Sequence, residues 1–101
     1  MPLLIKWSAF NKKNILAEKN TFGIYEIGDG NGNIVYIGEG KLRDRLNSHF
    51  LGGSDPIGRS AKYRKESTGS KERAEERERA ELRAYKKTHN GKLPTYNERL
   101  G

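Results

Sequence analysis

The chain has 101 residues, a formal net charge of +7 at pH 7 and no cysteine. This length indicates a single domain over residues 1–101, because folded domains cluster at roughly 100–150 residues. Without cysteine, a disulfide framework, a thiolate zinc site and a cysteine nucleophile are excluded. The surplus of Lys and Arg indicates a polyanionic partner, either nucleic acid or an anionic membrane surface.

Two patterns that would direct the chain to a membrane are missing from the sequence. No apolar run approaches the roughly 18 residues of a membrane-spanning helix. The first residues also lack the small-residue cleavage site of a signal peptide. We therefore expect a cytoplasmic protein with no membrane partner.

The first half of the chain predicts a β-hairpin behind an irregular start. Residues 1–20 mix apolar side chains with Lys and Asn at no clear period, which indicates a strand or an irregular lead-in with a short helix. Thr21 to Ile27 and Ile34 to Gly38 are rich in β-branched and aromatic residues, as strands are. The Gly- and Asn-rich segment 28–33 between them tolerates the positive φ of a tight turn.

The second half predicts two helices and one further strand. Leu42 to Phe50 carries its apolar side chains on one helical face, and Ser70 is a suitable N-cap for a long helix over about 70–87. Ala61 to Ser67 predicts a third strand between these helices, and residues 93–97 predict an extended tail. The fold class is therefore α+β, a small three-stranded sheet with helices packed on it.

The glycines of the predicted turn resemble parts of two ligand-binding loops, and neither loop fits. A dinucleotide-binding loop needs a helix after its glycines, whereas a strand follows segment 28–33 here. A calcium loop needs glycine at its sixth position and glutamate at its twelfth, where this chain has Ile34 and Gly40. A hairpin turn explains these glycines.

Chemistry-bearing residues occur as an ordered set rather than as one motif. The words Gly23-Ile24-Tyr25 and Tyr36-Ile37-Gly38 put two tyrosines on adjacent strands of the predicted hairpin. Arg45 and His49 follow four residues apart, so they share one face of the next helix. These residues combine a cation, an imidazole and two phenols in a short stretch of chain.

The rest of the set completes a resemblance to a known family. Glu78 lies on the long helix, and Asn97 closes the segment Pro94 to Asn97. In this order and spacing, the residues resemble the motifs of the GIY-YIG nuclease superfamily over roughly residues 22–97. The resemblance implies a three-stranded antiparallel sheet flanked by helices, and one divalent metal ion, Mg²⁺ or Mn²⁺, on a single carboxylate.

The residues that match the family's motif positions are Tyr25, Tyr36, Arg45, His49, Glu78 and Asn97, with Glu78 as the metal ligand. Glu81 is a second choice for the ligand, but Ala74 and Leu82 frame Glu78 as small and aliphatic residues do in the family. Arg43 competes with Arg45, but it has no histidine four residues on.

These residue types suit phosphodiester cleavage. The guanidinium of Arg45 offers a planar fork of donors to phosphate oxygens, and Mg²⁺ on Glu78 neutralises developing charge. We predict that Tyr25 orients or deprotonates the attacking water with support from Tyr36. Because a free phenol has a pKa near ~10, Tyr25 needs help from the metal, the arginine or a relay through His49.

The predicted function is a metal-dependent endonuclease acting on nucleic acid, with DNA favoured over RNA. The alternative is a catalytically weak or inactive module of the same fold that binds nucleic acid without cutting it. Contacts to the phosphate backbone are expected from the basic residues Lys41, Arg43, Lys62 and Arg64, with Lys12, Lys13 and Lys65 in support. The sequence leaves open whether a second copy or a partner protein takes part.

Overall fold

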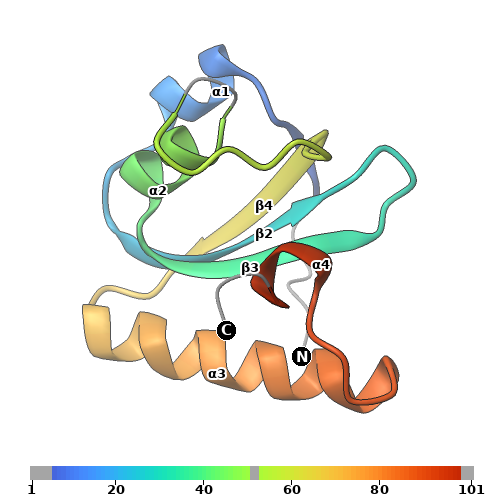
Figure 1. The fold of residues 1–101 in the computed structure, drawn as a ribbon. Helices are drawn as coiled ribbons and strands as arrows, with labels where there is room; N and C mark the ends of the chain where they lie inside the picture. Colours follow the sequence, from blue (N-terminus) through green and yellow to red (C-terminus); the bar gives the residue numbers. More distant parts are fainter. Residues whose placement is uncertain (1–5, 51–52, 99–101) are drawn as a thin grey trace.

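The computed structural model describes residues 6–50 and 53–98, which form a four-stranded sheet with helices on both faces (Figure 1). The elements in chain order are β1 (Ser8–Ala9), α1 (Lys12–Ala17), β2 (Phe22–Gly28), β3 (Ile34–Lys41), α2 (Leu42–His49), β4 (Lys62–Ser67), α3 (Lys71–Thr88) and α4 (Thr95–Glu98). The strand order is β1-β4-β2-β3, and all neighbours are antiparallel. The predicted α+β class is confirmed.

The sheet has one strand more than predicted, because β1 pairs with β4. Ser8 lies opposite Tyr63 and Ala9 lies opposite Lys62. The short helix expected near the start is α1, where the side chain of Asn11 accepts a hydrogen bond from the backbone N–H of Asn14 at 2.8 Å. Residues 1–5 of the predicted lead-in lie outside the described residues.

Strand β3 is longer than predicted. The sequence suggested that it ends at Gly38, but pairing with β2 continues to Lys41, which lies opposite Phe22. Gly40 adopts φ +133°, a conformation that glycine reaches without strain. The prediction was wrong because it took the glycines as strand breakers, whereas an antiparallel edge strand accommodates them.

The two faces of the sheet are covered unequally. Helices α1 and α2 lie on one face and α3 lies on the other, as Figure 1 shows. The larger core cluster, beneath α1 and α2, includes Tyr25, Ile27, Tyr36 and Leu46. On the α3 side, Ile24 and Ile37 pack against Leu82 and Tyr85. Alternate residues of the central strand β2 therefore serve two different cores.

Helix α3 begins and ends at local signals in the sequence. Ser70 is its N-cap, as predicted, and its hydroxyl accepts from the N–H of Arg73 at 3.2 Å. At the other end, Asn90 and Gly91 have positive φ, and the N–H of Gly91 bonds to the carbonyl of Lys86 at 2.8 Å. None of the described helices, α3 included, combines the length and apolarity needed to cross a membrane.

The C-terminal tail forms a short helix, α4, rather than the predicted extended segment. Pro94 directly precedes the helix. Proline is tolerated there because a backbone N–H at a helix start makes no hydrogen bond within the helix. The helix packs against the edge strand β3. There the N–H of Ile37 donates to Oδ1 of Asn97 and Nδ2 of Asn97 donates to the carbonyl of Ile37, both at 2.9 Å.

Replacing Asn97 by Ala should therefore lower the free energy of unfolding by roughly 1–2 kcal/mol, because two backbone groups at the sheet edge lose their partners. Asn31→Ala is the matched control, since Asn31 is exposed in the hairpin turn and should shift stability by less than about 0.5 kcal/mol. Urea unfolding measures both. An Asn97→Ala variant as stable as the wild type would contradict the role of this contact.

Candidate active site

Tyr25 and Tyr36 lie beside each other under α2. Both side chains are buried, with exposed fractions of 0 % and 5 %. Their ring centroids are 6.1 Å apart and the rings are tilted by 31°. The strand register places Tyr25 opposite Gly38 and Tyr36 opposite Ile27. The predicted position of the two tyrosines on adjacent hairpin strands is confirmed.

Two glycines of β3 make room for the site. A Cβ at Gly38 would lie 2.4 Å from the hydroxyl of Tyr25 and 2.7 Å from Cε2 of Tyr36. A Cβ at Gly40 would lie 2.8 Å from Cγ of Arg45. The ring of Tyr25 therefore extends over β3 at Gly38, where the strand carries no side chain. The side chain of Arg45 extends over the same strand at Gly40.

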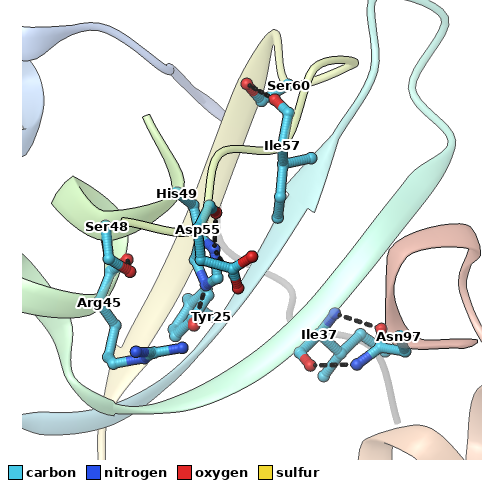
Figure 2. Close-up of polar contacts among 9 residues, drawn as sticks. All are labelled: Tyr25, Ile37, Arg45, Ser48, His49, Asp55, Ile57, Ser60 and Asn97. Carbon is cyan, nitrogen blue, oxygen red and sulfur yellow. Dashed lines mark hydrogen bonds and ion pairs between the residues drawn. The ribbon is translucent and has the colours of Figure 1, made fainter. Parts of the chain in front are cut away.

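Helix α2 supplies Arg45 to both tyrosines. The half-buried guanidinium interacts with the hydroxyl of Tyr25 and with the hydroxyl of Tyr36. Figure 2 shows its side chain directed from α2 toward Tyr25. Arg43, the competing arginine, is exposed on the same helix. The geometry favours Arg45.

His49, the last residue of α2, lies against the tyrosines in the core. Its side chain is fully buried, and Nε2 is 2.8 Å from the hydroxyl of Tyr25. Its ring centroid is 4.7 Å from that of Tyr36. The other nitrogen, Nδ1, is 3.0 Å from the backbone carbonyl oxygen of Asp55 (Figure 2). The helix thus brings a guanidinium and an imidazole to one phenol.

The phenols are held in their neutral form. Burial raises the pKa of Tyr25 far above its ordinary value and the neighbouring Tyr36 raises it further, while Arg45 opposes both effects. Burial also raises the pKa of Tyr36. A phenolate at Tyr25 therefore forms only when a base accepts its proton and positive charge remains close by.

Glu78 approaches the same groups from α3. The negative charge of its carboxylate raises the pKa of Tyr36, and the positive charge of Arg45 lowers the pKa of Glu78. Burial raises the pKa of Glu78, and the carboxylates of Glu39 and Glu75 add to this effect. The site therefore draws on both faces of the sheet around the edge strand β3, with the arginine and the phenols on one side and Glu78 on the other.

Glu39 belongs to the site, and the sequence reasoning missed it. It lies two residues after Ile37 on β3, so it projects toward α3, where Ile37 packs against Leu82. Its Oε2 is buried and has no hydrogen-bond partner within the described part of the chain. Extending the predicted strand beyond Gly38 would have put Glu39 on this face.

Glu81, the second choice for the metal ligand, occupies a different environment. Its side chain is 3 % exposed, and its Oε1 lies 3.5 Å from the guanidinium of Arg77. Of the two carboxylates, Glu78 is the one that interacts with Arg45 and the tyrosines. Glu78, rather than Glu81, is therefore the carboxylate that acts on the other candidate residues.

Asn97 contacts the backbone of β3. Both of its amide atoms bond to the backbone of Ile37, the residue after Tyr36 (Figure 2). The sequence placed it in the catalytic set; in the structure its amide supports the strand that carries Tyr36, because the edge of β3 would otherwise leave these backbone groups unpaired.

The predicted nucleic-acid contacts divide into two groups. Lys41 and Arg43 are exposed at the start of α2, beside the site. Arg64 instead contacts Glu26, with Nε 2.5 Å from Oε1, and lies over the ring of Trp7 at 4.2 Å. Lys62 also lies over Trp7, at 5.5 Å. Arg64 is thus engaged within the fold, which makes it the weaker candidate.

Because Gly38 faces the Tyr25 ring, Gly38→Ala should destabilise the protein by about 1–3 kcal/mol, the usual cost of overpacking. It should also displace the hydroxyl of Tyr25 from His49. Gly30→Ala is the control, since a Cβ there meets no atom within 4 Å. Urea unfolding gives the stability, and tyrosine and histidine NMR signals report the displacement. Equal effects of both changes would refute the steric role of Gly38.

Comparison with known proteins identifies the family of the chain. Residues 1–87 match the model of the family described as Domain of unknown function (DUF7508). A search of curated proteins finds no match, and a search of solved structures finds none either. The match covers β1 to all but the last residue of α3, and so includes both tyrosines, Arg45, His49 and Glu78. The chain belongs to the DUF7508 family.

Proposed function

We propose that this domain is a metal-dependent endonuclease that hydrolyses phosphodiester bonds in nucleic acid. The observation that carries the proposal is the position of Arg45, whose guanidinium interacts with the hydroxyls of Tyr25 and Tyr36 and with the carboxylate of Glu78. A cation bonded to two phenols, with a carboxylate within reach of its charge, matches the needs of phosphoryl chemistry: charge neutralisation, positioning of water and metal binding.

The same residues support membership of the GIY-YIG nuclease superfamily. Five of the six motif residues, Tyr25, Tyr36, Arg45, His49 and Glu78, interact directly or through one another. Of the glycines in the two motif words, Gly38 makes room for the rings of Tyr25 and Tyr36, whereas Gly23 makes room for the backbone of Glu66 and the side chain of Leu42. We favour DNA as substrate because the motif set resembles nucleases that cut DNA.

The carboxylates near Arg45 fit a divalent ion. Within residues 6–50 and 53–98, no three His, Asp or Glu side chains are grouped so as to hold a metal, so the protein would contribute one or two ligands. Mg²⁺ commonly binds through one or two carboxylates and completes its shell with water and phosphate oxygens. Glu78 and Glu39 would hold it, and the buried unpartnered Oε2 of Glu39 suits a cation. When bound, the ion supplies charge neutralisation at the phosphate.

Arg45 would bind the scissile phosphate. Its guanidinium is half-buried, so its hydrogen bonds are less screened than those of a surface arginine. Because Gly40 has no side chain to displace it, the arginine can lie across β3 and reach both tyrosine hydroxyls. The same donors would stabilise the additional negative charge on the phosphate oxygens in the transition state.

Tyr25 and His49 would handle the proton of the attacking water. The hydroxyl of Tyr25 lies 2.8 Å from Nε2 of His49, within reach for proton transfer. Loss of that proton to His49 gives a phenolate beside Arg45, which lowers the pKa of Tyr25 against the effect of burial. The phenolate can then accept a proton from water, while Tyr36 keeps the ring of His49 in place.

The decisive assay is cleavage of labelled single-stranded, duplex, flap and branched DNA and RNA with Mg²⁺, Mn²⁺ or EDTA. We expect metal-dependent cutting that falls at least about a hundredfold in Glu78→Gln, because the variant loses charge at the metal. Glu76→Gln is the matched control: it removes the same charge from an exposed position of α3 and should cut at the wild-type rate.

Two outcomes would contradict the proposal. Cutting that persists in EDTA or in Glu78→Gln would remove Glu78 from the metal site. Salt-sensitive binding of nucleic acid without cutting under any of these conditions would instead support the alternative function, a module that binds nucleic acid.

A further inference from the structure

The hydrogen bonds of His49 determine which of its nitrogens carries the proton. Nδ1 faces the backbone carbonyl oxygen of Asp55 at 3.0 Å, and a carbonyl oxygen only accepts. Nδ1 must therefore carry a hydrogen. In the neutral ring, Nε2 is then the acceptor, and the hydroxyl of Tyr25 donates to it over 2.8 Å.

The carboxylate of Asp55 adds a charge at the same nitrogen. Its Oδ2 lies 3.6 Å from Nδ1 of His49, and its side chain is 31 % exposed (Figure 2). The other titratable or charged groups that face His49 or the phenol bonded to it are Tyr25 on β2, Tyr36 on β3, Arg45 on α2 and Glu78 on α3, which acts on the phenol. Of the two carboxylates, Asp55 is the one beside the imidazole itself. An imidazolium at His49 would therefore have the carboxylate of Asp55 as a neighbour.

Backbone hydrogen bonds to the end of α2 hold Asp55 in this position. The N–H of Asp55 donates to the carbonyl of Ser48 at 2.8 Å, and the N–H of Ile57 donates to the carbonyl of His49 at 2.9 Å. Ile57 is fully buried in the larger core. A Cβ at Gly53 would lie 2.5 Å from the carbonyl oxygen of Ser48, so the segment packs closely on the end of α2.

We propose that Asp55 is a positioning residue for proton transfer from Tyr25: its backbone carbonyl holds His49 in the Nδ1–H form, and its carboxylate stabilises the imidazolium that results. In the step concerned, the O–H bond of Tyr25 breaks and an N–H bond forms at Nε2, giving a phenolate and an imidazolium with no change in total charge. The role in proton transfer rests on the proposed nuclease function, whereas the assignment of the Nδ1–H tautomer does not.

The test uses the full chain labelled with ¹⁵N at histidine. The sequence contains two histidines, so the exposed His89 serves as an internal reference for buried His49. We expect the ¹⁵N shifts and couplings of His49 to identify Nδ1–H in the wild type and in Asp55→Asn, which keeps the backbone carbonyl. In Asp55→Asn, the imidazolium should form at a pH lower by roughly half a unit, as expected for loss of a partly exposed charge.

The control is Asp44→Asn, which removes one charge from an exposed position on α2 and should leave the signals of His49 unchanged. In the cleavage assay, Asp55→Asn should reduce kcat by roughly threefold to tenfold with little change in KM, because Asp55 does not touch the substrate.

These measurements separate failure of the inference from failure of the proposed function. An Nε2–H form in the wild type would overturn the tautomer, and identical titration of His49 in Asp55→Asn and Asp44→Asn would overturn the role of the carboxylate. Both readings are taken without substrate. They therefore hold even for a protein that binds nucleic acid and does not cut it.

Discussion

The missing side chain at Gly38 is the constraint from which the geometry of the site follows. The hydroxyl of Tyr25 extends over the neighbouring strand at a place where any Cβ would overlap it. In that position the phenol reaches His49, and Arg45 reaches both phenols because Gly40 leaves a second gap in the same strand. A pair of alternate glycines on one strand thus lets side chains from β2 and α2 meet.

The edge strand β3 carries both an unfavourable charge pair and a contact that offsets its cost. Glu39 and Glu78 bring two carboxylates together between the sheet and α3, and their repulsion raises the pKa of Glu78 beyond the effect of burial. Such repulsion destabilises the folded state unless a cation or a proton offsets it. Asn97 compensates nearby by pairing with both backbone groups of Ile37. Proteins commonly tolerate destabilising contacts where function needs them, and other contacts offset the loss of stability.

Local signals in the sequence predicted most of the fold. The alternation in β2, the Gly- and Asn-rich turn and the N-cap Ser70 each depend on neighbouring residues, and each is confirmed. The failures depend on tertiary contacts. The strand β1 exists because two residues pair with β4, and the helix α4 forms where the tail packs on β3.

The candidate site shows the same division. Tyr25, Tyr36, Arg45 and His49 could be named because fixed spacings on a hairpin and a helix put them together. Asp55 could not be named, because a backbone carbonyl contact has no pattern in the sequence. Glu39 was missed because the predicted strand stopped at Gly38. Asn97 was found by its motif, but its role depends on which atoms its amide meets.

Paramagnetic broadening of the protein's NMR signals by Mn²⁺, in the presence of an oligonucleotide that resists cleavage, tests the central claim most directly. A single metal and phosphate site around β3 predicts that broadening is centred on Glu39 and Glu78 and extends to Tyr36 and Arg45. It should be lost in Glu78→Gln. Broadening centred on another group of carboxylates, such as the turn at Asp29, or spread over the surface without a centre, would contradict the account.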